Sequence, residues 1–220
     1  MDFFQALQER SSIRSFLPKP VDEVLLGKML QAAGHSPSYM NTQPWEVFVV
    51  TGKKKEDLSA ELLKASERGE PPRPDFPFPK IWPEAPEKRS TTHRLRRFAA
   101  LGIDPNDKEK IRLSYLRNFK FFDAPCGIFI GLDKSLTPWS MFDLGLFVHG
   151  FLMALHVEGL GGCPQAMLTA YPDIVRQHLL IADNINIALG ISLGYPDNDS
   201  PLNSYRSQRK EVNEFVHWYK

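Results

Sequence analysis

Three short stretches of the chain concentrate apolar residues in the manner of buried strands. They are 47–50 (VFVV), 126–130 (CGIFI) and 185–193 (INIALGISL). Each is rich in β-branched or aromatic residues and is bounded by Pro or Gly, as at Pro44 and Pro125, which is typical of a strand rather than of a helical segment. We therefore predict three buried strands.

Helical patterns account for much of the remaining sequence. In 22–34 the apolar residues recur at three- and four-residue spacing, Asp22 is a candidate N-cap and Gly34 ends the pattern. The chain is predicted to form helices at 2–9, 22–34, 53–68, 87–101, 107–122, 141–157 and 172–180. The 141–157 segment is apolar around most of its circumference, so we expect a central buried helix. Its polar residues Asp143, His149 and His156 are assigned structural rather than catalytic roles.

Composition narrows the class of protein. The 220 residues, 42% hydrophobic and 24% charged, fit a single soluble domain spanning 1–220. A net charge of +1 gives no indication of a nucleic-acid or membrane partner, and no apolar run approaches the roughly 20 residues of a membrane helix. Cys126 and Cys163 lack metal-ligand spacing, which favours free thiols in a reducing compartment and hence a cytoplasmic protein.

A proline-rich stretch interrupts the pattern after residue 68. Seven prolines between 69 and 86 exclude regular helix and central strand there, yet Phe76, Phe78, Ile81 and Trp82 lie among them. A disordered linker does not normally carry so many large apolar residues. We expect an ordered excursion, at about 69–100, that packs over a surface or pocket; a linker between two domains is the alternative.

Four polar or glycine-rich clusters are candidates for ligand binding. The segment Arg10-Ser11-Ser12-Ile13-Arg14 combines two guanidiniums with hydroxyls, a chemistry that suits a phosphate, although a solvated turn has the same composition. Residues 36–43 carry hydroxyl and amide groups that could face a polar heterocycle or simply form a turn. A Gly-Gly turn at Gly161-Gly162 would let a flat ligand approach the backbone, and the tail adds Arg206 and Arg209.

Known catalytic signatures are missing from the sequence. It contains no P-loop, no HExxH motif, no paired Cys motif and no Ser-His-Asp order. Chemistry carried by a bound organic cofactor is consistent with that pattern.

Taken together, the motifs resemble those of the FMN-dependent nitroreductases. The matching pieces run in order along nearly the whole chain, and the Pro-rich insertion with Trp82 is similar to the nitrobenzoate reductase subgroup. They are Arg10–Phe16, Ser36–Trp45, Phe122–Pro125, Asp143-Leu-Gly145, Gly159-Leu-Gly161 and Gly194-Tyr-Pro196, followed by Asn203, Arg206 and Arg209.

This resemblance implies an α+β fold with three α/β/α layers. A central mixed, mostly antiparallel sheet would be flanked by helices, and two intertwined chains would form a homodimer with FMN sites at their interface. Phosphate and ribityl contacts would come from Arg10, Ser11, Ser12, Arg14, Arg206 and Arg209. Pro37, Ser38 and Asn41 of the other subunit would line the flavin, and the Gly161-Gly162 backbone would face its N5/O4 edge. Phe76, Trp82 and Trp139 would cover the exposed flavin face as a substrate pocket.

The implied reaction is hydride transfer in a ping-pong cycle. NADPH or NADH would reduce the flavin, and an aromatic acceptor, a nitroaromatic or a quinone, would then reoxidise it. No side-chain acid or base and no metal is required for the hydride step. Enone reduction or dehalogenation on the same cofactor, or flavin binding without turnover, are the alternatives. His149-Gly150 departs from the Gln-Asn pair that relatives often carry, and Cys163 receives no role.

Overall fold

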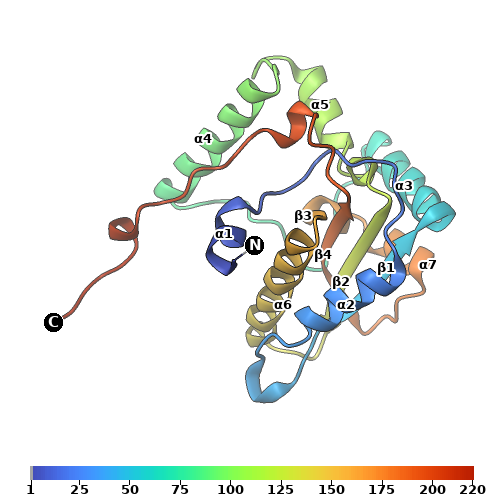
Figure 1. Ribbon diagram of the computed structural model, residues 1–220. Helices are drawn as coiled ribbons and strands as arrows, with labels where there is room; N and C mark the ends of the chain where they lie inside the picture. Colours follow the sequence, from blue (N-terminus) through green and yellow to red (C-terminus); the bar gives the residue numbers. More distant parts are fainter. Residues whose placement is uncertain (1) are drawn as a thin grey trace.

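A four-stranded antiparallel sheet forms the centre of the protein, and seven α-helices surround it in the computed structural model, which describes residues 2–220 (Figure 1). The strands are β1 (Glu46–Thr51), β2 (Cys126–Asp133), β3 (Gly161–Gln165) and β4 (Ile185–Gly194). The helices are α1 (Phe3–Glu9), α2 (Glu23–Ala33), α3 (Gly52–Glu67), α4 (Glu84–Ala100), α5 (Lys108–Leu116), α6 (Pro138–Val157) and α7 (Pro172–Leu179). The predicted α+β class is confirmed.

The sheet has the strand order β1-β2-β4-β3, and each of its neighbouring pairs is antiparallel. The isolated bridge between Ser12 and Gly162 is parallel, so the N-terminal segment runs alongside the start of β3. This bridge places the Arg10–Arg14 segment at the edge of the sheet, next to the glycine pair.

Helices cover both faces of the sheet. The side chains of β2 alternate between the two faces and are apolar on both, so each face packs against helices. Cys126, Ile128 and Ile130 pack with residues of α2 and α6 in one layer. Phe129 packs with residues of α3 and α7 in the other. The result is the three-layer α/β/α arrangement.

The long helix α6 is the core helix of the first layer. Among the described residues it is the one helix long and apolar enough to cross a membrane. Part of its apolar surface is accounted for by packing, since Leu144, Phe147, Phe151, Leu152 and Leu155 are buried in the layer that contains the sheet and α2. His149, however, is exposed, contrary to the expectation of a helix buried on nearly all sides, because one face of α6 is left uncovered in the single chain.

Three details of the sequence prediction are wrong. The stretch around 47–50 is an edge strand with only Val50 buried, because β1 pairs with β2 alone. The strand β3 was missed because its sequence, GGCPQ, has glycines and a proline in place of β-branched residues. The helix predicted at 107–122 ends at Leu116. Beyond it, Phe121, Phe122 and Asp123 take positive φ angles, outside the right-handed helical region, and both phenyl rings are buried in the core.

The proline-rich excursion is ordered, and its first part is fastened to α7 and β4. Arg176 of α7 pairs with Asp75 at 2.5 Å, and both side chains are nearly buried. Asp75 also accepts a hydrogen bond from the backbone N–H of Ile187 at 2.7 Å. Phe76 and Phe78 then pack against the two apolar layers. These contacts attach the first part of the excursion to the body of the protein.

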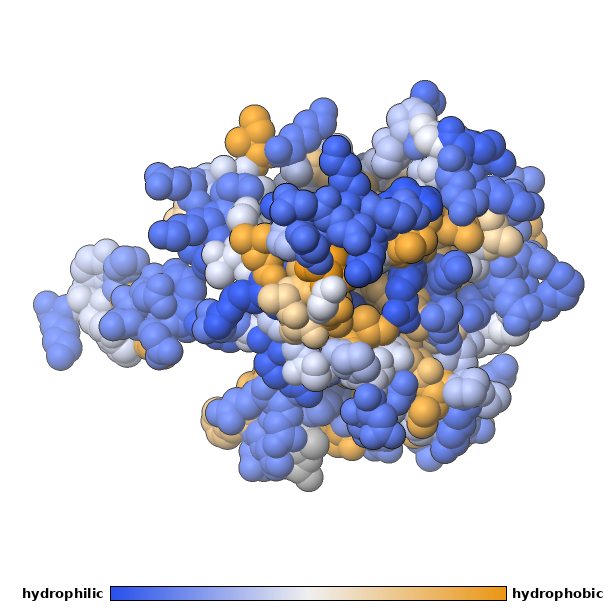
Figure 2. Space-filling model, turned by 90° about the horizontal axis from the view of Figure 1, so that it is seen from above, coloured by the Kyte–Doolittle hydropathy of each residue, from blue (hydrophilic) through white to orange (hydrophobic). Residues whose placement is uncertain are grey.

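The C-terminal segment runs along α4 and then leaves the body of the protein (Figures 1 and 2). Seen from above, hydrophilic side chains dominate this face of the molecule, and the segment protrudes as a separate lobe (Figure 2). Phe215, Trp218 and Tyr219 at its end are exposed, Tyr219 by 94%. These aromatic residues have no place in the core of their own chain.

Candidate functional site

A cavity of about 650 Å³ lies between the end of α1, helix α4 and the C-terminal segment. Six of the predicted cofactor-binding residues line it together: Arg10, Ser11, Ser12, Arg14, Arg206 and Arg209. They come from the two ends of the sequence, which the fold brings side by side. The two segments therefore meet within one chain.

Asn203 links the C-terminal segment to the N-terminal segment that carries Arg10 and Arg14. This side chain is buried, with 8% of its surface exposed. Its Oδ1 accepts the backbone N–H of Arg14 at 2.7 Å, and its Nδ2 donates to the carbonyls of Ser15 and Asp197, each at 2.8 Å. All the hydrogen bonds of the amide oxygen and nitrogen are thus directed at the backbone. Asn203 is a positioning residue that fixes where the Arg14 backbone lies.

The arginines of this cavity have no acidic partners. Within residues 2–220, none of Arg10, Arg14, Arg206 and Arg209 forms an ion pair with a carboxylate. Arg206 and Arg209 donate instead to carbonyl oxygens of residues 203–208. Burial, followed by the positive charge of Arg209, lowers the pKa of Arg10. One carboxylate, Glu9, also lines the cavity, but it pairs with none of the four arginines. Four cations against one carboxylate still form a site for an anion.

Helix α4 adds His93 to the cavity, a residue that sequence reasoning did not assign to the cofactor; Arg97 lies on the same helix but does not line the cavity. His93 lines the cavity, and its Nδ1 lies 3.1 Å from the hydroxyl of Tyr205. Burial, and then the charges of Arg14, Arg97 and Arg209, lower the pKa of His93. Burial and the charge of Arg14 likewise lower the pKa of Arg97. The only sequence signal for either residue was the basic composition of the helix.

The two glycines at the start of β3 are buried in a strand rather than exposed in a turn, which corrects the prediction. A Cβ on Gly161 would lie 2.3 Å from Cγ1 of Ile13, and one on Gly162 would lie 2.8 Å from Cδ2 of Leu152. Packing within the chain therefore explains why both are glycines. Their backbone still lines a small cavity of about 110 Å³ that shares Arg10, Ser11 and Arg206 with the larger one.

Thiol chemistry receives little support at this site. Cys163, the third residue of β3, is buried, and its burial raises the pKa of the thiol against the opposing charges of Arg14 and Arg97. Cys126 of β2 is also buried, which raises the pKa of its thiol to about 12. Both are therefore thiols at neutral pH rather than nucleophilic thiolates. Within residues 2–220, no group of three or more His, Cys, Asp or Glu side chains is placed to hold a metal ion.

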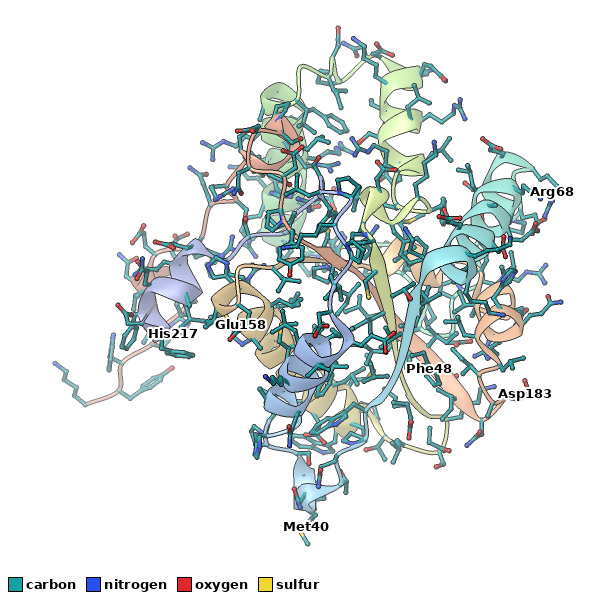
Figure 3. All side chains as sticks on the ribbon, turned by 45° about the vertical axis from the view of Figure 1, so that its right-hand side comes forward. Met40, Phe48, Arg68, Glu158, Asp183 and His217 are labelled. Carbon is teal, nitrogen blue, oxygen red and sulfur yellow. The ribbon has the colours of Figure 1, made fainter. Side chains whose placement is uncertain are left out.

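The third predicted segment, with Pro37, Ser38 and Asn41, lies elsewhere. It is fixed to the beginning of α6, where the backbone N–H of Tyr39 donates to both carboxylate oxygens of buried Asp143 at 3.2 Å. The arginine cavity lies near the other end of that helix. Met40 projects from the lower tip of the molecule, whereas Glu158, just after α6, lies apart from it (Figure 3). Between Asp143 and Val157 the helix rises about 21 Å.

The predicted substrate-pocket residues also lie outside the arginine cavity of their own chain. Trp139 is 65% exposed and stacks on Tyr39 with ring centroids 6.3 Å apart, at the 36–41 loop. Trp82 is 46% exposed ahead of α4. Phe76 is half-buried and packs against the core layer that contains α6. Within one chain, the arginine set and the 36–41 loop with Trp139 therefore lie at opposite ends of α6.

Comparison with known protein families places this geometry in context. Residues 7–195 match the nitroreductase family. The chain belongs to the nitroreductase family. Its relatives include 4-nitrobenzoate reductase of Pseudomonas putida, 32% identical over 99% of this chain and 95% of that protein. They also include nitrobenzene nitroreductase of Ectopseudomonas oleovorans, 33% identical over 96% and 93% of the two chains.

A solved nitroreductase has nearly the same fold. The FMN-dependent nitroreductase NfnB from Mycobacterium smegmatis, in complex with NADPH, superposes with a TM-score of 0.94. The two chains are 28% identical, and the match covers 100% of each. The nitroreductase fold of the present chain, including its excursion and C-terminal segment, thus has a counterpart along its whole length.

Proposed function

We propose that this nitroreductase binds FMN in the arginine cavity and reduces nitroaromatic compounds with NADPH or NADH. The single observation that carries the proposal is the set of arginines from both ends of the chain, clustered in one cavity without carboxylate partners among residues 2–220. A phosphate monoester offers the charge and the oxygen acceptors that such a set requires. The names of the relatives supply the reaction class.

The chain's own residues would bind and orient the cofactor. Arg10, Arg206 and Arg209 would hold the phosphate, and Ser11 and Ser12 would donate hydroxyls beside it. Asn203 would fix Arg14 against the adjoining part of the ligand. The Gly161-Gly162 backbone, in the small cavity that continues from the arginines, would face the ring. Bound FMN would supply the redox chemistry for hydride transfer from NAD(P)H to a nitroaromatic or quinone in a ping-pong cycle.

A second copy of the chain is needed to complete this site. The loop with Pro37, Ser38 and Asn41 is anchored to the opposite end of α6 from the cavity, so it would reach an FMN only in a partner subunit. The uncovered face of α6 carries exposed Trp139, Phe142 and Val157, and the C-terminal aromatics extend outward. Burial of such apolar surface is a driving force for association. The proposed enzyme is therefore a homodimer, with Trp139 and the Phe76–Trp82 excursion covering the substrate position.

The compartment proposed for the enzyme is the cytoplasm. Both cysteines are free and buried, which is compatible with a reducing environment.

Anaerobic stopped-flow spectroscopy tests the reaction. The FMN-loaded protein is mixed with NADPH, and the loss of visible flavin absorbance is followed. It is then mixed with nitrobenzene or 4-nitrobenzoate, which should restore that absorbance. Parallel double-reciprocal plots in steady state are expected for a ping-pong cycle. A flavin that NADPH and NADH both fail to bleach would exclude the oxidoreductase function.

Subunit complementation tests the shared site. One variant carries Arg10→Met and Arg206→Met, and a second carries Ser38→Trp and Asn41→Trp; each alone should lose FMN. Refolding the two together creates heterodimers with one intact site, so FMN binding and activity should return. No recovery from mixtures shown to contain heterodimer would place all the binding residues in one chain.

A further inference from the structure

A second basic hollow adjoins the cofactor cavity. It measures about 630 Å³ and lies between α4 and the C-terminal residues 205–214. His93, Tyr205 and Arg209 line both cavities and form the boundary between them. The small glycine cavity, the arginine cavity and this hollow thus follow one another along one side of the protein.

The charge of this hollow is unbalanced. Five cationic side chains line it against a single carboxylate, Glu214; they are Lys88, Arg89, Arg96, Arg209 and Lys210. The whole chain has a net charge of only +1. Within residues 2–220, Lys88, Arg89 and Arg96 take part in no ion pair and in no side-chain hydrogen bond. A concentration of free donors at one hollow is a recognition site for an anion with several oxygens.

Helical spacing places these groups on one face of α4, toward the hollow. Lys88, Thr92 and Arg96 recur every four residues on α4, and Ala85, Arg89 and His93 form the neighbouring row. The small Ala85 leaves room in the hollow, and the Tyr205–His93 pair supplies aromatic surface, with ring centroids 5.3 Å apart. A nucleotide has both parts that this lining suits, a flat base and phosphate groups.

We propose that the hollow binds the adenosine 2′-phosphate end of NADPH and so makes NADPH the preferred reductant over NADH. The proposal rests on the proposed function, because it concerns the reductant of the same reaction. A dinucleotide whose nicotinamide reaches the flavin must extend its adenosine half beyond the cofactor cavity, and this hollow is the continuation of that cavity. NADH lacks the phosphate that Lys88, Arg89 and Arg96 would bind, so it gains nothing from them.

Calorimetric titration of the FMN-loaded protein tests binding without turnover. Adenosine 2′,5′-bisphosphate should bind about tenfold or more tightly than adenosine 5′-monophosphate, because only the first has the 2′-phosphate. In the Arg89→Gln/Arg96→Gln variant this difference should largely disappear. Arg94→Gln is the matched control, since Arg94 is an exposed arginine on the same helix that does not line the hollow. Equal binding of the two nucleotides by the unmodified protein would overturn the proposal.

Flavin reduction separates this proposal from the proposed function. The Arg89→Gln/Arg96→Gln variant should lose about tenfold or more in kcat/KM for NADPH, with FMN content and kcat/KM for NADH unchanged. A protein that binds no FMN contradicts the proposed function. A protein that binds FMN and uses NADPH and NADH equally, before and after the double substitution, contradicts only the 2′-phosphate site.

Discussion

Substituting Gly161 by alanine tests how the chain forms the wall of the site. The new Cβ would lie 2.3 Å from Cγ1 and 2.9 Å from Cβ of Ile13, and 3.2 Å from Cγ of Pro196. Rotation of the Ile13 side chain cannot relieve a contact with its Cβ. The backbone must therefore shift. The hydrogen bond from Ile13 N–H to the carbonyl of Gly162, at 3.2 Å, opposes that shift. Overpacking of this kind costs about 1–3 kcal/mol of unfolding free energy.

The assay is urea unfolding of the cofactor-free protein at one fixed protein concentration. Gly27→Ala is the matched control, because Gly27 is an exposed residue of α2 and a methyl group added there would meet no atom within 4 Å. That control should stabilise the protein by about 0.5–1 kcal/mol, as alanine is the better helix former. The same substitution of glycine by alanine should thus lower the free energy of unfolding at Gly161 and raise it at Gly27.

A double-mutant cycle shows whether Ile13 is the cause. Ile13→Ala alone should cost about 2–5 kcal/mol, since Ile13 is buried. Combined with Gly161→Ala, it removes the closer contact, with Cγ1, and lets the added methyl fill part of the space, although the 2.9 Å contact with Cβ remains. The double variant should therefore cost at least about 1 kcal/mol less than the sum of the single costs. Additive costs, or a Gly161→Ala protein as stable as the original, would refute the packing argument and favour a glycine kept for ligand approach.

Four further predictions concern Asp75 in the excursion and two residues of the site, Asn203 and His93. Asp75→Asn should lower the unfolding free energy by about 3 kcal/mol, because it leaves Arg176 without its buried partner. Thermal or urea unfolding measures the loss of stability, and a loss below about 1 kcal/mol would contradict the prediction. Asn203→Ala should cost about 2–4 kcal/mol, since three hydrogen bonds to backbone groups are lost, and should weaken FMN binding as Arg14 shifts. The pKa of His93, lowered in the free protein by burial and neighbouring arginines, should rise when FMN brings a phosphate beside it, as followed by NMR titration. In the free protein, stability should fall as pH drops through the ordinary value of 6.5, because the unfolded chain takes up a proton that folded His93 resists, and His93→Gln should remove that part of the loss.

Local patterns in the sequence were sufficient for the elements with strong periodicity. The β-branched run in β4 and the capping residue Asp22, whose carboxylate accepts the N–H of Leu25, specify their structures within a few neighbouring residues. The strand β3 does not, because Gly161 and Gly162 become a strand only through pairing with β4 and packing against Ile13 and Leu152. Tertiary contacts decide such a segment, and no local propensity reveals them.

The arginines of the site were predictable and their surroundings were not. Arg10 and Arg14, interleaved with hydroxyls, indicate a phosphate by residue type alone. That Arg206 joins them depends on the fold; from the sequence, the tail arginines were one of four candidate clusters, and nothing local placed them beside Arg10. His93 is an ordinary member of a basic helix in the sequence, and only the packing of α4 beside Tyr205 gives it a place at the cavity.

The most direct test of the central claim compares the binding of FMN and riboflavin, which differ by the phosphate alone. Fluorescence titration of the cofactor-free protein gives both dissociation constants. If the unpaired arginines bind a phosphate, FMN should bind at least about a hundredfold more tightly, and Arg10→Met should remove about tenfold or more of that difference while leaving riboflavin binding unchanged. Equal affinities for FMN and riboflavin in the unmodified protein would contradict the assignment of the arginine cavity to the cofactor's phosphate.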